Sequence, residues 1–200
     1  MKPKEQSLIS FFKKRGGITR FSTLLKAGFH SDSLVALEKQ KKVEKIGRGL
    51  YRLADHIPDD HPDLVTSCLQ APKGVICLLS ALRYHEATDE IPQAVDIALA
   101  RGTYANKIDY PPVKFYRFAL ESWKTGIEEH NMGGHQVRIY NLAKTVADCF
   151  KFRNRIGMDV AREALKIAVK QKRISPKEIM RYAKICRVSN IIKPILESIL

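Results

Sequence analysis

The feature that most limits the fold of this chain is the spacing of glycines in its first 55 residues, which leaves room for short elements. A glycine after an apolar, periodic segment is typical of a helix end, and glycines on both sides of one residue are typical of a tight turn. The pattern therefore predicts three short helices followed by a β-hairpin. The helices are expected at 7–15, 20–27 and 32–41, with Thr19 and Ser31 as caps of the second and third, and the strands at 43–46 and 50–54.

This order of elements is typical of a winged helix-turn-helix, in which the third helix enters the major groove of DNA and the hairpin forms the wing. The N-terminal residues of the third helix are expected near base edges, and the basic residues near phosphates. The predicted DNA-binding residues are Arg20, His30, Ser31, Ser33, Lys39, Lys41, Lys42, Lys45, Arg48 and Arg52.

Arg48 stands between Gly47 and Gly49, at the expected tip of the wing. At that place an arginine can contact a phosphate, enter the minor groove, or remain in solvent. We expect a phosphate or minor-groove contact, and the sequence leaves the choice between these two open.

Charge is distributed unevenly along the chain. Residues 1–55 hold 13 Lys/Arg and 5 Asp/Glu, residues 56–150 hold 9 and 12, and residues 151–200 hold 13 and 4. Basic ends around a mildly acidic middle indicate a polyanionic partner, most often nucleic acid and less often an anionic membrane surface. In the basic C-terminal part of the chain, a secondary basic surface is predicted. Its residues are Arg153, Arg155, Arg162, Lys166, Lys170, Lys172 and Arg173.

The rest of the chain predicts an α+β fold, with a mixed α/β domain and C-terminal helices after the winged helix. The expected organisation is 1–55 as the DNA-binding domain, 56–73 as a linker with a short helix, and 74–200 as the second domain. Within it, a buried helix is expected at 74–87, strands at 94–100, 112–120 and 135–141, and helices capped by Asn141, Ser175 and Asn190, with a further helix at 158–172.

Several residue types invite a catalytic or metal-binding interpretation, but a structural one is favoured for each. His85 lies on an apolar helix. His130 and His135 flank a Gly-Gly turn, but no further metal ligands are nearby in the sequence. Lys144 and Asp148 have the spacing of a helix ion pair. The four cysteines show no CxxC pair and are expected to be buried and reduced.

Motifs of other function classes are absent from the sequence. It has no phosphate-binding loop, no dinucleotide fingerprint, no Gly-x-Ser-x-Gly elbow and no Gly-Ser with paired aspartates. No apolar run has the length of a membrane span or signal peptide. We therefore expect a cytoplasmic protein that is not an enzyme and that needs neither a metal nor another cofactor.

Three segments resemble the AbiEi family, the antitoxins of AbiE-type (type IV) toxin–antitoxin systems. They are GGITRFSTLLKAGFHSDSLVALEKQKKVEKIGRGLYRL at 16–53, GVICLLSALRYHEATDEIP at 74–92 and VRIYNLAKTVADCFKFRNRIG at 137–157. The resemblance implies a winged helix joined to a mixed α/β domain. It also implies binding to operator DNA to repress the protein's own operon, while opposing a nucleotidyltransferase-like toxin without requiring a stable complex with it. The basic C-terminal helices depart from longer relatives and leave the role of the second domain open.

Two other functions remain as alternatives. One is a winged-helix transcription regulator whose second domain senses a ligand, with no toxin partner. The other is an enzyme or nuclease-associated factor, which should show a cleft with convergent polar residues and perturbed carboxylates. For the DNA-binding functions, we expect a homodimer on an operator with inverted repeats.

Overall fold

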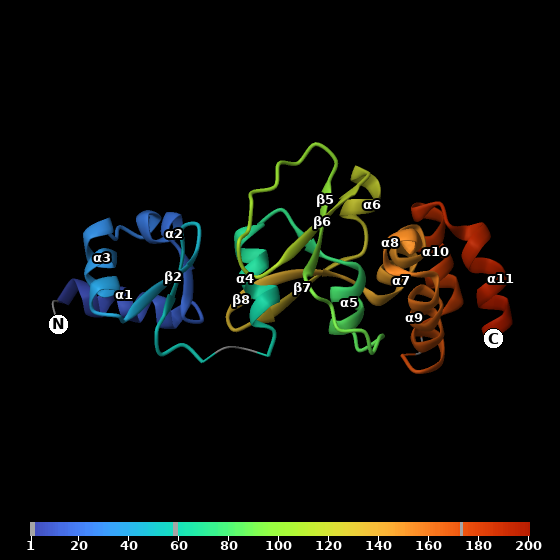
Figure 1. Ribbon diagram of the computed structural model, residues 1–200, viewed down its shortest axis with the longest axis horizontal. Coiled ribbons are helices and arrows are strands. Elements are labelled where there is room, and N and C mark those ends of the chain that lie inside the picture. Colours follow the sequence, from blue (N-terminus) through green and yellow to red (C-terminus); the bar gives the residue numbers. More distant parts are fainter. Residues whose placement is uncertain (1–2, 58–59, 173) are drawn as a thin grey trace. The chain divides into compact units, whose positions relative to one another are not determined.

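The computed structural model describes residues 3–57, 60–172 and 174–200, and it has the mixed α+β character expected from the sequence (Figure 1). Contacts divide the chain into two compact units. The first comprises Met1–Pro72, Asn106–Pro111 and His130–Val137, and the second comprises Lys73–Ala105, Pro112–Glu129 and Arg138–Leu200. In the described part of the chain, no helix is both long and apolar enough to cross a membrane.

The N-terminal segment, residues 3–53, contains the three expected helices and the expected hairpin, and also a short strand after the first helix that was not predicted. These are α1 (Pro3–Lys14), β1 (Ile18–Arg20), α2 (Phe21–Lys26), α3 (Ser31–Lys39), β2 (Val43–Gly47) and β3 (Leu50–Leu53). The strands pair antiparallel in the order β1-β3-β2. Their apolar side chains join those of the helices in one buried cluster: Leu8, Phe12, Leu24, Leu34, Leu37, Val43 and Leu53. This small core holds the segment together.

The caps of the second and third helices differ from the prediction. Thr19 lies in β1 opposite Tyr51 and is buried, so α2 begins one residue later, with Arg20 in the N-cap position. His30 is the N-cap residue of α3, and Ser31 is the first helical residue. Neither cap makes a side-chain hydrogen bond. Strand pairing in the first case, and burial of Leu34 and Leu37 in the second, therefore set where these helices start.

The remaining elements up to the C-terminal helices are three helices and a five-stranded mixed sheet. They are α4 (Pro62–Gln70), β4 (Val75–Ile76), α5 (Leu78–Tyr84), β5 (Val95–Ala100), β6 (Val113–Phe118), α6 (Leu120–Lys124), β7 (Ile127–Met132) and β8 (His135–Tyr140). The strand order is β6-β5-β4-β8-β7, with β5 parallel to β6 and β4 antiparallel to β5. The three predicted strands are confirmed as β5, β6 and β8.

The helix expected over 74–87 is wrong in its first part. Val75 and Ile76 pair with β5 as β4, and Leu78 then has a positive φ of 47°. Such a backbone angle interrupts a right-handed helix, so α5 begins only at Leu78, and it ends at Tyr84, three residues before the predicted end. Strand β7 has no predicted counterpart, because its residues Glu128, Glu129 and His130 lack the apolar alternation of a half-buried strand.

The C-terminal part is helical, as expected. Its helices are α7 (Leu142–Lys151), α8 (Arg153–Ile156), α9 (Met158–Lys170), α10 (Pro176–Cys186) and α11 (Ser189–Ile199). Asn141 and Ser175 are confirmed as caps, since their side chains accept hydrogen bonds from the backbone N–H groups of Lys144 and Glu178. The expected cap at Asn190 is wrong, because Val188 precedes the first turn of α11.

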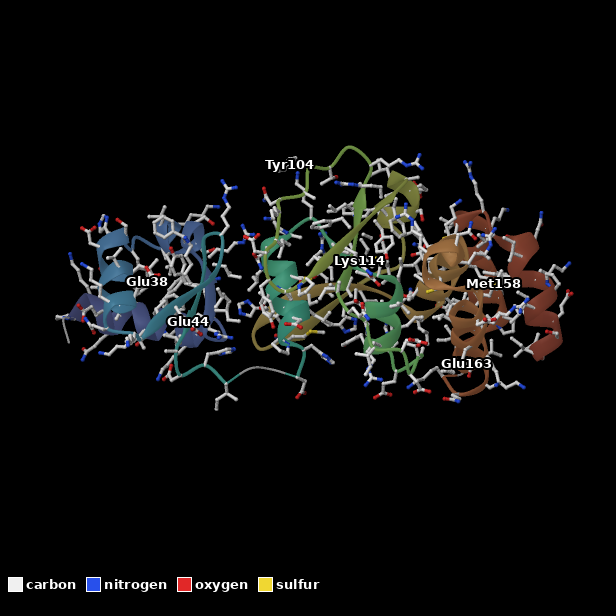
Figure 2. All side chains as sticks on the ribbon, in the orientation of Figure 1. Glu38, Glu44, Tyr104, Lys114, Met158 and Glu163 are labelled. Atoms are coloured by element: carbon white, nitrogen blue, oxygen red, sulfur yellow. The ribbon has the colours of Figure 1, made fainter. Side chains whose placement is uncertain are left out.

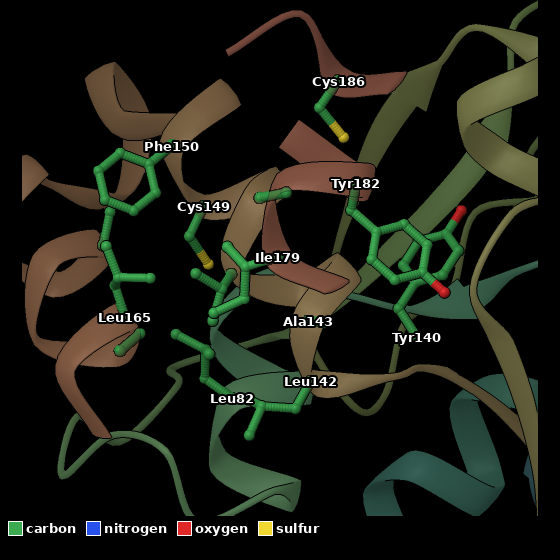
Figure 3. Close-up of a cluster of buried hydrophobic side chains, with 14 of the residues drawn as sticks. Leu82, Tyr140, Leu142, Ala143, Cys149, Phe150, Leu165, Ile179, Tyr182 and Cys186 are labelled. Carbon is green, nitrogen blue, oxygen red and sulfur yellow. The ribbon is translucent and has the colours of Figure 1, made fainter. Parts of the chain in front are cut away.

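Helix α7 lies at the centre of the large apolar cluster of the second unit and packs against α5, α9 and α10 (Figure 3). Every residue from Leu142 to Phe150 is buried. Two of them are charged: the Lys144 Nζ donates to the Asp148 carboxylate at 2.5 Å, with 0% and 1% of these side chains exposed. The predicted ion pair is therefore confirmed. Its complete burial was not predicted, because the spacing of two residues in a helix does not indicate burial.

The surroundings of this pair come from other elements. The Lys144 Nζ lies 4.2 Å from the centre of the Tyr140 ring and 5.0 Å from that of Phe118. The Cys186 thiol donates to the second Asp148 oxygen at 3.2 Å. Burial raises the pKa of the Asp148 carboxyl, while the Lys144 ammonium and the Cys186 thiol oppose that rise. Strands β6 and β8 and helix α10 thus all contribute to compensating the two buried charges.

Replacing Lys144 with Met tests this dependence. Lys144→Met leaves the Asp148 carboxylate buried without its cation, and the free energy of unfolding should fall by about 3–5 kcal/mol. Lys193→Met removes the same i,i+4 type of pair where both side chains are more than half exposed, and should cost at most about 0.5 kcal/mol. Urea unfolding measures both values.

The double variant Lys144→Met/Asp148→Leu should recover most of the loss, since no uncompensated charge remains. Equal losses for Lys144→Met and Lys193→Met would contradict a central role for the buried pair.

Candidate nucleic-acid interface

The start of α3 presents short polar side chains to solvent. His30 and Ser31 are exposed and Ser33 is half-buried. Asp32 accepts a hydrogen bond from the Ser31 hydroxyl at 3.3 Å and stands at the positive end of the helix dipole. The side chains expected near base edges therefore lie together at one helix end, and one of them is a carboxylate.

Basic side chains follow α3 and continue along the hairpin. Lys39, Lys41, Lys42, Lys45 and Arg48 are all exposed. Lys39, Lys41, Lys45 and Arg48 have no carboxylate partner among the described residues. Cations that are not neutralised by the protein are free to replace the counterions of a phosphate backbone.

Lys41 occupies a backbone position that usually favours glycine. Its φ is 56°, and it follows the last turn of α3. The N–H of Lys41 donates to the carbonyl of Glu38, and the N–H of Lys42 donates to that of Leu37, both at 2.9 Å. This is a Schellman ending with lysine in the left-handed position. A side chain there costs about 1 kcal/mol relative to glycine.

The hairpin tip consists of two residues. Gly47 pairs with Leu50, so Arg48 and Gly49 form the loop, and Gly49 has a φ of 65° with nothing within 4 Å of an added Cβ. The glycine supplies the turn angle, while Arg48 extends from it into solvent. The expected place of Arg48 at an exposed tip is thus confirmed; what it contacts remains a prediction.

Two of the predicted phosphate contacts are used inside the protein. The Arg52 guanidinium donates to the Glu44 carboxylate on the neighbouring strand. The Arg20 Nε donates to the backbone carbonyl of Leu69, and burial lowers the pKa of Arg20. Cross-strand pairing and packing on α4 create these contacts, so the local sequence did not reveal them. Both side chains are half-buried and are less available to a polyanion than the lysines of the hairpin.

Of the seven residues predicted to form the secondary basic surface, three lie together on one face of a helix. Arg162, Lys166 and Lys170 are exposed at four-residue spacing on α9, which places them in one row. Arg153 donates to the carbonyl of Phe150 and Lys172 pairs with Glu86. Arg155 packs over the Tyr116 ring, and Arg173 lies outside the described residues.

A hollow of about 640 Å³ lies beside this row. Its lining includes the carboxylates of Asp89, Glu90, Asp159 and Glu163. Glu163 also approaches the Lys166 Nζ at 3.6 Å. Carboxylates next to the row weaken its attraction for phosphates, so the N-terminal segment is the better candidate for a nucleic-acid interface.

His85 and the Cys186 thiol make structural contacts. His85 Nε2 lies 2.8 Å from the Tyr140 carbonyl, and among the described residues no group of three or more His, Cys, Asp or Glu is placed to hold a metal ion. Burial raises the pKa of the thiols of Cys77 and Cys149, which disfavours the reactive thiolate. All four cysteines are free; Cys77, Cys149 and Cys186 are buried as expected, whereas Cys68 is only half-buried.

The alternative function as an enzyme predicts a carboxylate with a perturbed pKa, and Asp96 on β5 is such a group. Burial raises its pKa to about 6. Its Oδ2 accepts the N–H of Leu79 at 3.2 Å, and its own N–H donates to the Ser80 hydroxyl at 2.9 Å. The Tyr116 hydroxyl donates to it as well. These contacts attach the first turn of α5 to the sheet and give the carboxylate a structural role.

No protein-family model matches the sequence, and no match is found among curated proteins.

Asp96→Asn tests the structural role through the pH dependence of stability. The protonated acid is favoured in the folded state, so the contribution of Asp96 to wild-type stability falls as the pH rises from about 4 to 6, while the amide does not titrate. The free energy of unfolding of the variant minus that of the wild type should therefore rise by about 2–3 kcal/mol between pH 4 and pH 7.

Urea unfolding across this pH range measures the difference. The exposed Asp89→Asn is the control for the loss of a surface carboxylate. A difference for Asp96→Asn that does not change with pH would show that burial does not perturb this carboxylate.

Proposed function

We propose that this chain binds duplex DNA and represses transcription of its own operon as the antitoxin of a toxin–antitoxin pair. In this proposal residues 3–53 form a winged helix-turn-helix, with α2 and α3 as the helix-turn-helix and the β2–β3 hairpin as the wing. The element order and the turn at Gly28, whose φ is 83°, support this assignment.

The observation that carries the proposal is the set of unpaired cations between the end of α3 and the hairpin tip. Lys39, Lys41, Lys45 and Arg48 are exposed, and the described residues offer them no carboxylate. The lysine at position 41 is further support, because a basic side chain is present where glycine would cost less backbone energy. A contact with phosphates gives both features one explanation.

The role within a toxin–antitoxin pair rests on the resemblance of the three segments to the AbiEi family. In this proposal the second unit belongs to an antitoxin that opposes a nucleotidyltransferase-like toxin, and the chain itself catalyses no reaction. Direct contact with the toxin is not required. Co-expression with a nucleotidyltransferase encoded beside the gene tests this part, and the absence of any rescue of growth would overturn it.

Arg48→Ala tests the wing. In a gel shift with the DNA upstream of the gene, the variant should bind up to about tenfold more weakly, and its salt slope should fall by about 0.9 because one phosphate contact is lost. Its melting curve should match the wild type, since the side chain is exposed and has no partner in the described residues. Lys193→Ala, an exposed lysine on α11, serves as the control for a lost charge.

Wild-type binding that is no tighter to this DNA than to random duplex would overturn the operator proposal as a whole. An unchanged affinity and salt slope for Arg48→Ala would exclude the wing alone.

Lys41→Gly separates binding from stability. Relief of the left-handed backbone strain should raise the free energy of unfolding by up to about 1 kcal/mol. Loss of the cation should weaken operator binding and lower the salt slope by about 0.9. Chemical unfolding and the same gel shift measure the two effects; a variant that is stabilised and binds DNA like the wild type would contradict a DNA contact at this position.

A further inference from the structure

The carboxyl ends of β5 and β6 lie side by side in the second unit. The strands are parallel, Ala100 pairs with Phe118, and the N–H of Arg101 donates to the carbonyl of Phe118 at 2.9 Å. The loop after β5 leaves the sheet at this point. Ligands of open sheets with parallel strands commonly bind just outside the carboxyl ends of the strands.

A surface hollow of about 520 Å³ lies at this place, lined by residues 101–105 and Arg117. The turn that forms it is held from two sides. The N–H of Thr103 donates to the carbonyl of Ala100 at 3.1 Å, and the Arg117 Nη1 donates to the carbonyl of Thr103. The lining contains two guanidinium groups and no carboxylate, so the hollow attracts anions.

Tyr104 gives this hollow an aromatic surface. Its side chain is 84% exposed, and Figure 2 shows it on the loop between β5 and β6. In the described part of the chain its ring makes no stacking or cation–π contact. Arg101 is also exposed and has no carboxylate partner there. A planar apolar face and an unpaired guanidinium are thus both available to a ligand.

We propose that this hollow binds single-stranded nucleic acid, with one base stacked on Tyr104 and the adjoining phosphates at Arg101 and Arg117. Arg117 retains its Nε and Nη2 donors for a phosphate, since its Nη1 holds Thr103. Base faces in a duplex are covered by their neighbours, whereas a single strand exposes them to an aromatic side chain. The site is therefore distinct in ligand from the duplex interface proposed for residues 3–53.

Fluorescence anisotropy with the full chain and fluorescein-labelled oligo-dT or oligo-U of about 12 nucleotides tests the site. Tyr104→Ala should bind at least about fivefold more weakly, whereas Tyr104→Phe, which keeps the stacking face, should stay within about twofold of the wild type. Arg101→Ala should lower both affinity and salt slope. Arg83→Ala, an exposed arginine of α5, is the matched control.

A 5-iodouracil-substituted oligonucleotide should crosslink to Tyr104 on irradiation, which identifies the stacked residue directly. Equal single-strand affinity for wild type and a Tyr104→Ala variant with an unchanged melting curve would overturn the proposal. So would an equal loss of duplex and single-strand binding in that variant, which would indicate a general polyanion surface.

Competition with thymidine monophosphate tests whether the ligand is a strand or a single nucleotide. If an equal concentration of the mononucleotide displaces the oligonucleotide, the proposal of a single-stranded ligand is overturned. If it does not, the single strand is supported as the ligand. Failure of Arg48→Ala to affect duplex binding would leave these results unchanged, so this site and the proposed repressor function are tested separately.

Discussion

The fold of the second unit depends on compensating one ion pair buried inside α7. Lys144 and Asp148 lie in a helix whose neighbouring residues are all apolar or fully enclosed, and removing two charges from water costs several kcal/mol for each ion. The compensation comes from distant parts of the chain: the Tyr140 and Phe118 rings face the ammonium, and Cys186 donates to the carboxylate. These elements therefore have to assemble around α7 together, which couples strands β6 and β8 to helix α10.

The N-terminal segment uses its charges in the opposite way. Its small core is apolar, and the unpaired cations lie outside it along the end of α3 and the hairpin. Exposed charges cost little to keep in water, and binding becomes favourable when these cations replace the counterions condensed on a polyanion. Lys41 carries a backbone cost for its place in this row. Buried charge thus organises one unit, and exposed charge supports the proposed function of the other.

Much of the architecture was predictable because it depends on local patterns. Alternation identified β5 and β6, and capping chemistry placed Asn141 and Ser175 at helix starts. Strand β7 was missed because Glu128 and Glu129 interrupt its apolar alternation. Strand β4 was missed because two residues are too few to show a period. For the candidate interface, spacing identified Arg48 at a glycine-framed tip. It did not separate Arg48 from Arg20, whose Nε is held by a carbonyl 49 residues away.

The sequence by itself determined the order of the three N-terminal helices and the hairpin, the turn at Gly49, the pairing of Lys144 with Asp148, and the basic character of both ends. Each of these follows from residues within a few positions of one another, where propensity and spacing act. Tertiary structure decided how deeply that pair is buried, which arginines are used internally, and that Arg101, Tyr104 and Arg117 line one hollow. Those outcomes depend on contacts between distant segments, because burial and partnership arise only when the elements pack.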